Sequence, residues 1–259
     1  MARSIELPTQ ILHLPDGAAI AYHRSQGKGP GVMFMGGFMS DMTGTKAMAL
    51  ERWCHARSQA FLRFDYSGHG ASSGRFEDGT IGRWAAEAIT VLDRLTEGPQ
   101  ILVGSSMGAW LMLLAALARP ERIAGLLGVA CAADFIENTI WQALDGPARE
   151  RLQQEGVIYV PSDYDEIPCP ITLRLIEEAR HHSLLDRDAL PIHCAVRLLH
   201  GMRDASVPWR NSLRVAERVA SDDVHIVLVK DGEHRMSRDQ DLALLTSMLT
   251  ELITHSRGL

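Results

Sequence analysis

Short apolar runs alternate with longer stretches of mixed apolar and polar residues along most of the chain. The runs are rich in Val, Ile, Leu and Phe, and they begin near Gly31, Ala60, Gln100, Gly125, Val196 and His225. Continuous apolar runs of this length are typical of parallel strands covered on both faces. Between them, apolar residues recur at spacings of three and four, as in 81–95 and 242–252, which predicts helices. We therefore expect an α/β fold with a mostly parallel central sheet and helices on both faces.

Two segments refine this prediction. Residues 11–24 read ILHLPDGAAIAYHR, which predicts a hairpin at the antiparallel edge of the sheet with Asp16-Gly17 as its turn. Residues 98–118 contain no formal charge and have nearly the length of a membrane span, but GSSMG interrupts them. We interpret this second segment as a buried strand, a tight turn and a buried helix.

One connection is far too long for the regular alternation. About 65 residues separate the strand near Gly125 from the strand near Val196, whereas connections usually have about 2 to 6 residues. Helical composition occurs in three parts of this connection: 134–144, 148–155 and 171–182. We therefore predict an α/β core at 1–133 and 191–259, with a helical cap inserted at 134–190.

Composition and charge indicate which partners and which cellular compartment to expect. The chain has 259 residues, 46% of them apolar, with a net charge of -6 and no long basic run, which argues against a nucleic-acid partner. Residues 1–17 lack the apolar core of a signal peptide. The spacing of the four cysteines matches no zinc or redox motif, so we expect free thiols in a reducing compartment. We expect a cytoplasmic protein without a transmembrane segment.

The sequence from Gly104 to Gly108 reads GSSMG, a GxSxG motif between an apolar strand and an apolar helix. A sharp strand-to-helix turn needs small residues beside its central serine, because neighbouring backbone comes close to it. Ser106 would then lie at the N-terminus of a helix, whose dipole and free N–H groups favour a nearby oxyanion. The motif alone is also compatible with a plain loop, so the interpretation requires a base and a carboxylate elsewhere.

Suitable partners follow two later strands. Asp204 comes after the strand near Val196, and His234 comes after the strand near His225. The chain order Ser106, Asp204, His234 is that of α/β-hydrolases, and the carboxyl ends of parallel strands meet at one edge of a sheet. Asp134, which follows the strand near Gly125, remains an alternative acid.

The other histidines and acids have simpler interpretations. His200 and His225 lie in or at the start of strands, while His181 and His182 fall in the cap and are expected at its surface. Asp231 and Glu233 flank the expected base and are predicted to be solvated. These residues are therefore not assigned to the reaction.

Two backbone N–H groups are expected to bind the oxyanion. One belongs to Met107, directly after the serine, and the other to Phe38 in the glycine-rich loop 36–40. The segment 65–70, DYSGHG, resembles a phosphate loop, but the GxGxxG pattern fails at Ser73, and we interpret it as a structural turn that walls the site. We predict neither a cofactor nor a metal ion, because the chain contains no HExxH or P-loop motif.

Several long stretches resemble a known family. GPQILVGSSMGAWLMLLAALARPE, RFDYSGHGASSG and LLHGMRDASVPW, with GTKAMAL and EHRM, are similar to the α/β-hydrolase fold serine hydrolases, and in particular to their mitochondrial depalmitoylase and acyl-glucuronide esterase branch. The resemblance implies cleavage of S-acyl thioesters on protein cysteines and of acyl-glucuronide esters. It also implies that Ser106 is the nucleophile, Asp204 the acid and His234 the base. The loop 36–40 departs from the wider fold, since it lacks the usual His-Gly pair.

These observations predict a serine esterase or thioesterase that works through an acyl-enzyme, on a small ester or an acylated protein. Apolar residues of the cap are candidates for an acyl pocket: Phe135, Ile140, Trp141 and Leu144. An acyltransferase, peptidase or perhydrolase with the same triad remains an alternative, as does a non-catalytic binding protein of the same fold. The oligomeric state is not determined by the sequence.

Overall fold

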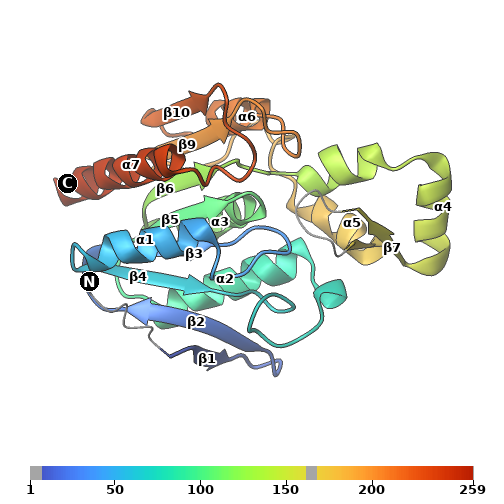
Figure 1. The fold of residues 1–259 in the computed structure, drawn as a ribbon, viewed down its shortest axis with the longest axis horizontal. Helices are drawn as coiled ribbons and strands as arrows, with labels where there is room; N and C mark the ends of the chain where they lie inside the picture. Colours follow the sequence, from blue (N-terminus) through green and yellow to red (C-terminus); the bar gives the residue numbers. More distant parts are fainter. Residues whose placement is uncertain (1–7, 162–167, 259) are drawn as a thin grey trace.

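A computed structural model describes residues 8–161 and 168–258 of the chain. Residues 1–7, part of the stretch expected to lack a signal peptide, and residues 162–167 of the predicted cap lie outside the described residues. In the described part, eight strands form one sheet in the order β1-β2-β4-β3-β5-β6-β9-β10 (Figure 1). These strands have the following bounds: β1 Gln10–His13, β2 Ala19–Ser25, β3 Lys28–Met35, β4 Gln59–Phe64, β5 Gln100–Ser105, β6 Ile123–Val129, β9 Val196–Gly201 and β10 Val224–Val229.

The sheet is antiparallel at one edge and parallel elsewhere. β1 pairs with β2, and β2 with β4, in antiparallel fashion, whereas β4, β3, β5, β6, β9 and β10 pair in parallel. The expected hairpin around Asp16-Gly17 is therefore present at the antiparallel edge. The predicted α/β-hydrolase fold with a mostly parallel sheet is confirmed.

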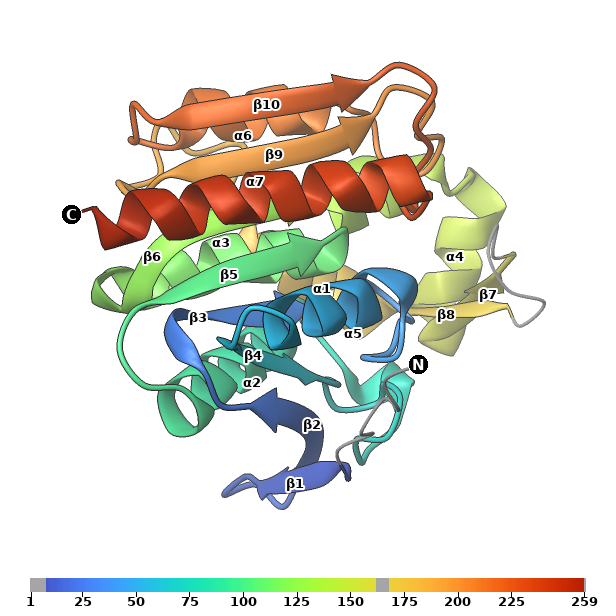
Figure 2. The ribbon, with the colours of Figure 1, turned by 60° about the vertical axis from the view of Figure 1, so that its left-hand side comes forward.

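Helices cover both faces of the sheet. α1 and α7 pack on one face through residues such as Leu50 and Leu249, against side chains that include Val103 of β5. α2, α3 and α6 lie on the opposite face, where β5 presents Leu102 (Figure 2). The alternation of side chains along a strand explains this division, because successive residues point to opposite faces. The bounds of these helices are α1 Thr45–His55, α2 Ile81–Leu95, α3 Met107–Ala118, α6 Arg210–Arg218 and α7 Asp239–Arg257.

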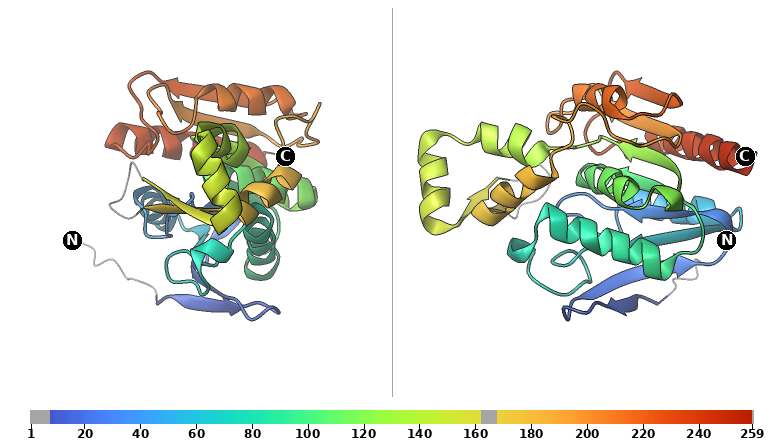
Figure 3. Two further views of the ribbon diagram at one scale, coloured as in Figure 1. Left: turned by 90° about the vertical axis from the view of Figure 1, so that its right-hand side faces the viewer. Right: turned by 180° about the vertical axis from the view of Figure 1, so that it is seen from behind.

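The chain between β6 and β9 leaves the sheet and forms a separate layer beyond the carboxyl ends of the parallel strands (Figures 1 and 3). This layer is not purely helical, because β7 and β8 pair there as a two-stranded antiparallel sheet. The elements of this layer have the following bounds: the π-helix η3 Ile136–Trp141, α4 Gly146–Glu155, β7 Val157–Val160, β8 Cys169–Thr172, α5 Leu173–Ala179 and η4 Arg180–His182. Two further short helices, η1 Phe76–Asp78 and η2 Pro120–Arg122, belong to the core.

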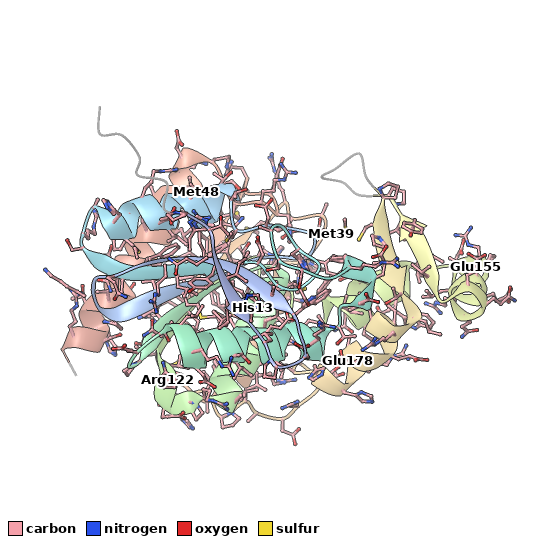
Figure 4. All side chains as sticks on the ribbon, turned by 90° about the horizontal axis from the view of Figure 1, so that it is seen from below. His13, Met39, Met48, Arg122, Glu155 and Glu178 are labelled. Atoms are coloured by element: carbon pink, nitrogen blue, oxygen red, sulfur yellow. The ribbon has the colours of Figure 1, made fainter. Side chains whose placement is uncertain are left out.

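Specific hydrogen bonds join this layer to the core. Glu178 of α5 accepts the backbone N–H of Gly82 at 3.0 Å, at the start of α2. Trp110 of α3 donates its indole N–H to the carbonyl of His182 at 3.1 Å. Figure 4 shows Glu178 on the part of the layer next to the core and Glu155 at its outer end. The layer therefore contacts α2 and α3 through its α5 side.

Candidate active site

Ser106 occupies the turn between β5 and α3. Its backbone has φ 55° and ψ -119°, a conformation that residues other than glycine rarely adopt. A Cβ atom at Gly104 would collide with the first turn of α3, and one at Gly108 with the carbonyl groups of Met35 and Gly36. The two glycines of the motif therefore permit both the sharp turn and the close packing of α3 against the end of β3.

His234 connects Ser106 with Asp204. Its Nε2 atom lies 3.1 Å from the Ser106 hydroxyl oxygen, and its Nδ1 atom lies 2.7 Å from Oδ2 of Asp204. The Asp204 side chain has no exposed surface and the His234 side chain retains 14%. Asp204 cannot donate as a carboxylate, so Nδ1 carries the proton, and Nε2 is left to accept the serine proton. The structure thus brings together the three side chains that the motif analysis selected.

The carboxylate of Asp204 is held by four groups. Oδ1 accepts the backbone N–H groups of Ser206 at 2.9 Å and Val207 at 2.7 Å. Oδ2 faces His234 and also His200, whose Nε2 lies 3.1 Å away. Burial raises the pKa of Asp204, but the hydrogen bonds from His200 and His234, the charge of His234 and the Val207 N–H together outweigh burial and hold the pKa well below its usual range. Asp204 is therefore ionised at neutral pH.

The loop that carries His234 is anchored to α1. The ammonium group of Lys46 donates to the carbonyl oxygen of Arg235, the residue after His234. Burial, and then the charge of Arg235, lower the pKa of Lys46 to about 8. Lys46 thus joins the helix behind the glycine-rich loop to the segment that positions the imidazole.

The two predicted oxyanion donors belong to segments next to Ser106. Met107 is the first residue of α3, where N–H groups have no acceptor inside the helix. The loop with Phe38 passes close to the serine, since a Cβ built on Gly37 would lie 3.4 Å from that of Ser106. Figure 4 shows Met39, the next residue of this loop, on the side of the core that faces the inserted layer. The glycine-rich loop and the first turn of α3 are therefore both adjacent to Ser106.

The segment 65–70 supports the loop beyond Phe38. The Asp65 carboxylate accepts the backbone N–H of Met42 at 2.6 Å and that of Ala71 at 2.8 Å. Arg63 donates to the carbonyl oxygen of the same Met42 at 2.9 Å. The backbone N–H and the carbonyl group of Met42 are thus held by β4 and by the residue that follows it, and the segment acts as a structural turn.

Asp134, the alternative acid, has a different environment. Its buried carboxylate accepts the backbone N–H groups of Leu184 at 2.9 Å and Leu185 at 2.8 Å. Burial raises its pKa more than these two hydrogen bonds lower it. Asp134 therefore joins the beginning of the inserted layer to its end, while Asp204 is the carboxylate that meets His234.

The predicted substrate contacts fall into two groups. Phe135 is buried and packs edge to face on Phe38, with ring centroids 5.5 Å apart, which places it next to the glycine-rich loop. Ile140 and Trp141 are half-buried against the core. The guanidinium groups of Arg149 and Arg180 lie 4.7 Å and 5.2 Å from the Trp141 ring centroid. The indole is therefore already stacked with protein groups, whereas Phe135 contacts the glycine-rich loop.

His200 is the site residue that the sequence analysis missed, because its position inside a strand suggested a packing role. The structure places its fully buried ring against Asp204. No local pattern marked this contact, because residues four apart in an extended strand lie far from each other, and the turn after β9 brings Asp204 back to His200. His181 and His182 do not approach Ser106 through any hydrogen bond in the described residues, and His182 instead lies 2.7 Å from Glu178.

The described residues contain neither a cluster that could hold a metal ion nor a helix that could span a membrane. Over residues 8–161 and 168–258, no group of three or more His, Cys, Asp or Glu side chains is arranged to hold a metal ion. The four cysteines are free thiols. Among the helices of the same residues, none combines the length and apolarity that a bilayer crossing requires.

Comparisons with known proteins agree with this fold. Residues 51–249 match the Alpha/beta hydrolase family. The chain is 45% identical to the palmitoyl-protein thioesterase ABHD10, mitochondrial, of Pongo abelii over 94% of this chain and 79% of that protein, and 44% identical over the same shares to its Homo sapiens counterpart. The solved structure of alpha/beta hydrolase domain-containing protein 10 from mouse superposes with a TM-score of 0.88 and 42% identity, over 96% of this chain and 99% of that chain.

These names correct one expectation. The cytoplasmic location predicted from the sequence is contradicted, because the similar proteins are named mitochondrial. The reasoning failed because the absence of an apolar signal core argues only against the secretory route. Free cysteines likewise indicate a reducing compartment without distinguishing one such compartment from another.

Proposed function

The chain belongs to the alpha/beta hydrolase family and is a hydrolase, and on this premise we propose that it cleaves S-acyl thioesters of protein cysteines through Ser106. The observation that carries the proposal is the position of His234, within hydrogen-bonding distance of both Ser106 and Asp204. The proposed thioester preference is supported by the similar proteins, which are named palmitoyl-protein thioesterases. Oxygen esters, including acyl glucuronides, are the related substrates that the same chemistry reaches.

The reaction begins at the serine hydroxyl. His234 Nε2 takes the proton of Ser106 while the serine oxygen attacks the acyl carbonyl carbon. Asp204 keeps the imidazole oriented and stabilises the charge that it gains. The tetrahedral intermediate then collapses, His234 returns the proton to the departing thiol, and the acyl group remains on Ser106.

The negative charge of the intermediate develops on the former carbonyl oxygen. We assign its stabilisation to the backbone N–H groups of Phe38, in the loop next to the serine, and of Met107, the first residue of α3. The positive end of α3 adds to their effect, because Ser106 directly precedes the first residue of that helix. Water then attacks the acyl-enzyme with His234 as its base, which releases the fatty acid and restores the serine.

The inserted layer is proposed as the cap that selects the acyl chain. Residues 134–190 would form this cap and residues 1–133 and 191–259 the catalytic core. Phe135 contacts the glycine-rich loop through Phe38, so the start of the cap adjoins the reacting carbonyl. Phe135 is therefore the first cap residue that we expect an acyl chain to meet, ahead of Ile140 and Trp141.

The test compares matched substrates with one acyl chain on a thiol, an alcohol and an amine. We expect kcat/KM to be highest for the thioester, lower for the ester and negligible for the amide. Equal or faster amide cleavage would favour a peptidase, and acyl transfer to an added alcohol or to hydrogen peroxide in preference to water would favour a transferase or a perhydrolase. The Ser106→Ala variant should lose about 10⁶-fold in kcat, as in another triad enzyme.

A further inference from the structure

His200 makes three polar contacts in a place that solvent does not reach. Its Nδ1 lies 2.7 Å from the hydroxyl of Ser212, and its Nε2 lies 3.1 Å from Oδ2 of Asp204 and 3.1 Å from the carbonyl oxygen of Val207. The side chain has no exposed surface. The ring is thus held between β9, which carries it, the loop after β9, and α6.

These contacts determine which nitrogen carries a proton. A carboxylate oxygen and a carbonyl oxygen only accept hydrogen bonds, so Nε2 of His200 must be the donor towards Asp204 and Val207. The hydroxyl of Ser212, itself fully buried, pairs with the opposite nitrogen. The ring therefore cannot turn over without leaving buried polar groups unpaired.

His200 completes the hydrogen bonding of Asp204. Backbone N–H groups of Ser206 and Val207 bind Oδ1, while His200 and His234 share Oδ2. A carboxylate bound on both oxygens is fixed in rotation about its Cβ–Cγ bond. Without His200, Oδ2 would be held only by the imidazole that it is supposed to orient.

We propose that His200 is a positioning residue, which fixes the carboxylate of Asp204 so that His234 is aligned with Ser106. The proposal rests on the proposed function, because it requires Asp204 and His234 to act on Ser106. His200 itself does not touch the substrate. The continuous path Ser212, His200, Asp204, His234 and Ser106 is the structural basis of this role.

The test compares two substitutions of His200, of which one keeps a hydrogen-bond donor towards Asp204 and the other does not. His200→Leu removes the donor, whereas His200→Gln places an amide N–H at about the reach of Nε2. The rate is expressed per active site, counted with a fluorophosphonate, so unfolded protein reduces the count and not the rate. We expect His200→Leu to lower kcat about 10- to 100-fold, the scale of a hydrogen bond to a charged group, with KM within twofold. His200→Gln should recover most of the loss.

Two results would overturn the positioning role: an unchanged kcat in His200→Leu, or a His200→Gln variant no faster than His200→Leu. If His200→Leu does not fold, Ser212→Ala replaces it in the test. Loss of the Ser212 hydroxyl removes the hydrogen bond to Nδ1 of His200, so the ring is free to move and kcat should fall several-fold. An unchanged kcat in Ser212→Ala would overturn the positioning role. Ser106→Ala separates the two hypotheses. An active Ser106→Ala enzyme refutes the proposed function itself, whereas an inactive one beside a fully active His200→Leu refutes only the role of His200.

Discussion

The Nδ1 atom of His234 lies 2.7 Å from Oδ2 of Asp204, although 30 residues separate them in the chain. They meet because β9 and β10 are parallel neighbours in the sheet and each residue follows the end of one of these strands. The short contact joins this buried anion to the imidazole whose Nε2 lies 3.1 Å from the Ser106 hydroxyl oxygen. The orientation of the imidazole therefore depends on Asp204.

Replacing Asp204 by Asn should lower kcat by about 10⁴-fold, because the amide favours the wrong tautomer of the imidazole, as in another triad enzyme. Steady-state hydrolysis of an acyl thioester measures the effect. Asp134→Asn is the matched control, since Asp134 binds Leu184 and Leu185 and not His234. If Asp134→Asn cripples the enzyme and Asp204→Asn does not, the assignment of the acid is wrong.

Asp134→Ala should destabilise the protein without changing the chemistry at the serine. The buried N–H groups of Leu184 and Leu185 lose their acceptor, and alanine is strained at the backbone φ of 59° found at this position. We expect the free energy of unfolding to fall by about 2–4 kcal/mol, measured by urea titration. A variant as stable as the parent would show that this link between the two ends of the inserted layer contributes nothing.

Gly108→Ala should impair both stability and turnover. The new methyl group meets the carbonyls of Met35 and Gly36, so α3 or the glycine-rich loop must move. Overpacking of this kind costs about 1–3 kcal/mol, and displacement of the loop weakens an oxyanion donor. Gly146→Ala is the control, since no atom lies within 4 Å of its added Cβ at the start of α4. Equal behaviour of the two variants in thermal unfolding and kcat would contradict the packing argument.

The four cysteines should react slowly in the folded protein. Burial raises the pKa of Cys54 and Cys131 to about 12, and that of Cys169 and Cys194 to about 11, so almost no thiolate is present at pH 7. Raising the pH should accelerate iodoacetamide labelling, and unfolding the protein in urea at constant pH should accelerate it further. Rapid labelling of any one cysteine at pH 7 in the folded enzyme would show that its thiol is less protected than its burial indicates.

The sequence predicted the elements whose pattern is strongly periodic or continuously apolar. The strands of the sheet and the helix at 81–95 carried clear signals, and they occur as β3 to β6, β9, β10 and α2. α6 gave a weak signal, because Val215 is its one buried apolar residue among the residues that the structure describes, beside the buried polar pair Asn211 and Ser212. The contacts of α6 with the rest of the fold, rather than its own sequence pattern, therefore show that it is a helix.

The inserted layer was predicted less well than the sheet. Pro170 of β8 pairs with Tyr159 of β7 in a sheet of two strands, although proline lacks the N–H group that a central strand needs. Proline is tolerated in such a strand because both strands are edges. Helical composition at 171–182 likewise concealed the strand residues Ile171 and Thr172.

The candidate site was predictable where a motif or a strand end marked a residue. Ser106, Asp204 and His234 were selected in this way, and the structure brings them together. His200 was not, because its contact with Asp204 depends on how one turn returns after β9. The stacking of Arg149 and Arg180 on Trp141 was not predictable either, because these residues come from different segments whose contact no local sequence pattern indicates.

The most direct test of the account is the position at which a fluorophosphonate attaches, determined by mass spectrometry after digestion of the wild-type enzyme and a His234→Ala variant. Activation of Ser106 by His234 predicts one phosphonate on the peptide that contains Ser106, and very slow labelling of this peptide when the imidazole is missing. Attachment at another residue, or equal labelling rates in the two proteins, would contradict the claim that these side chains form one catalytic unit.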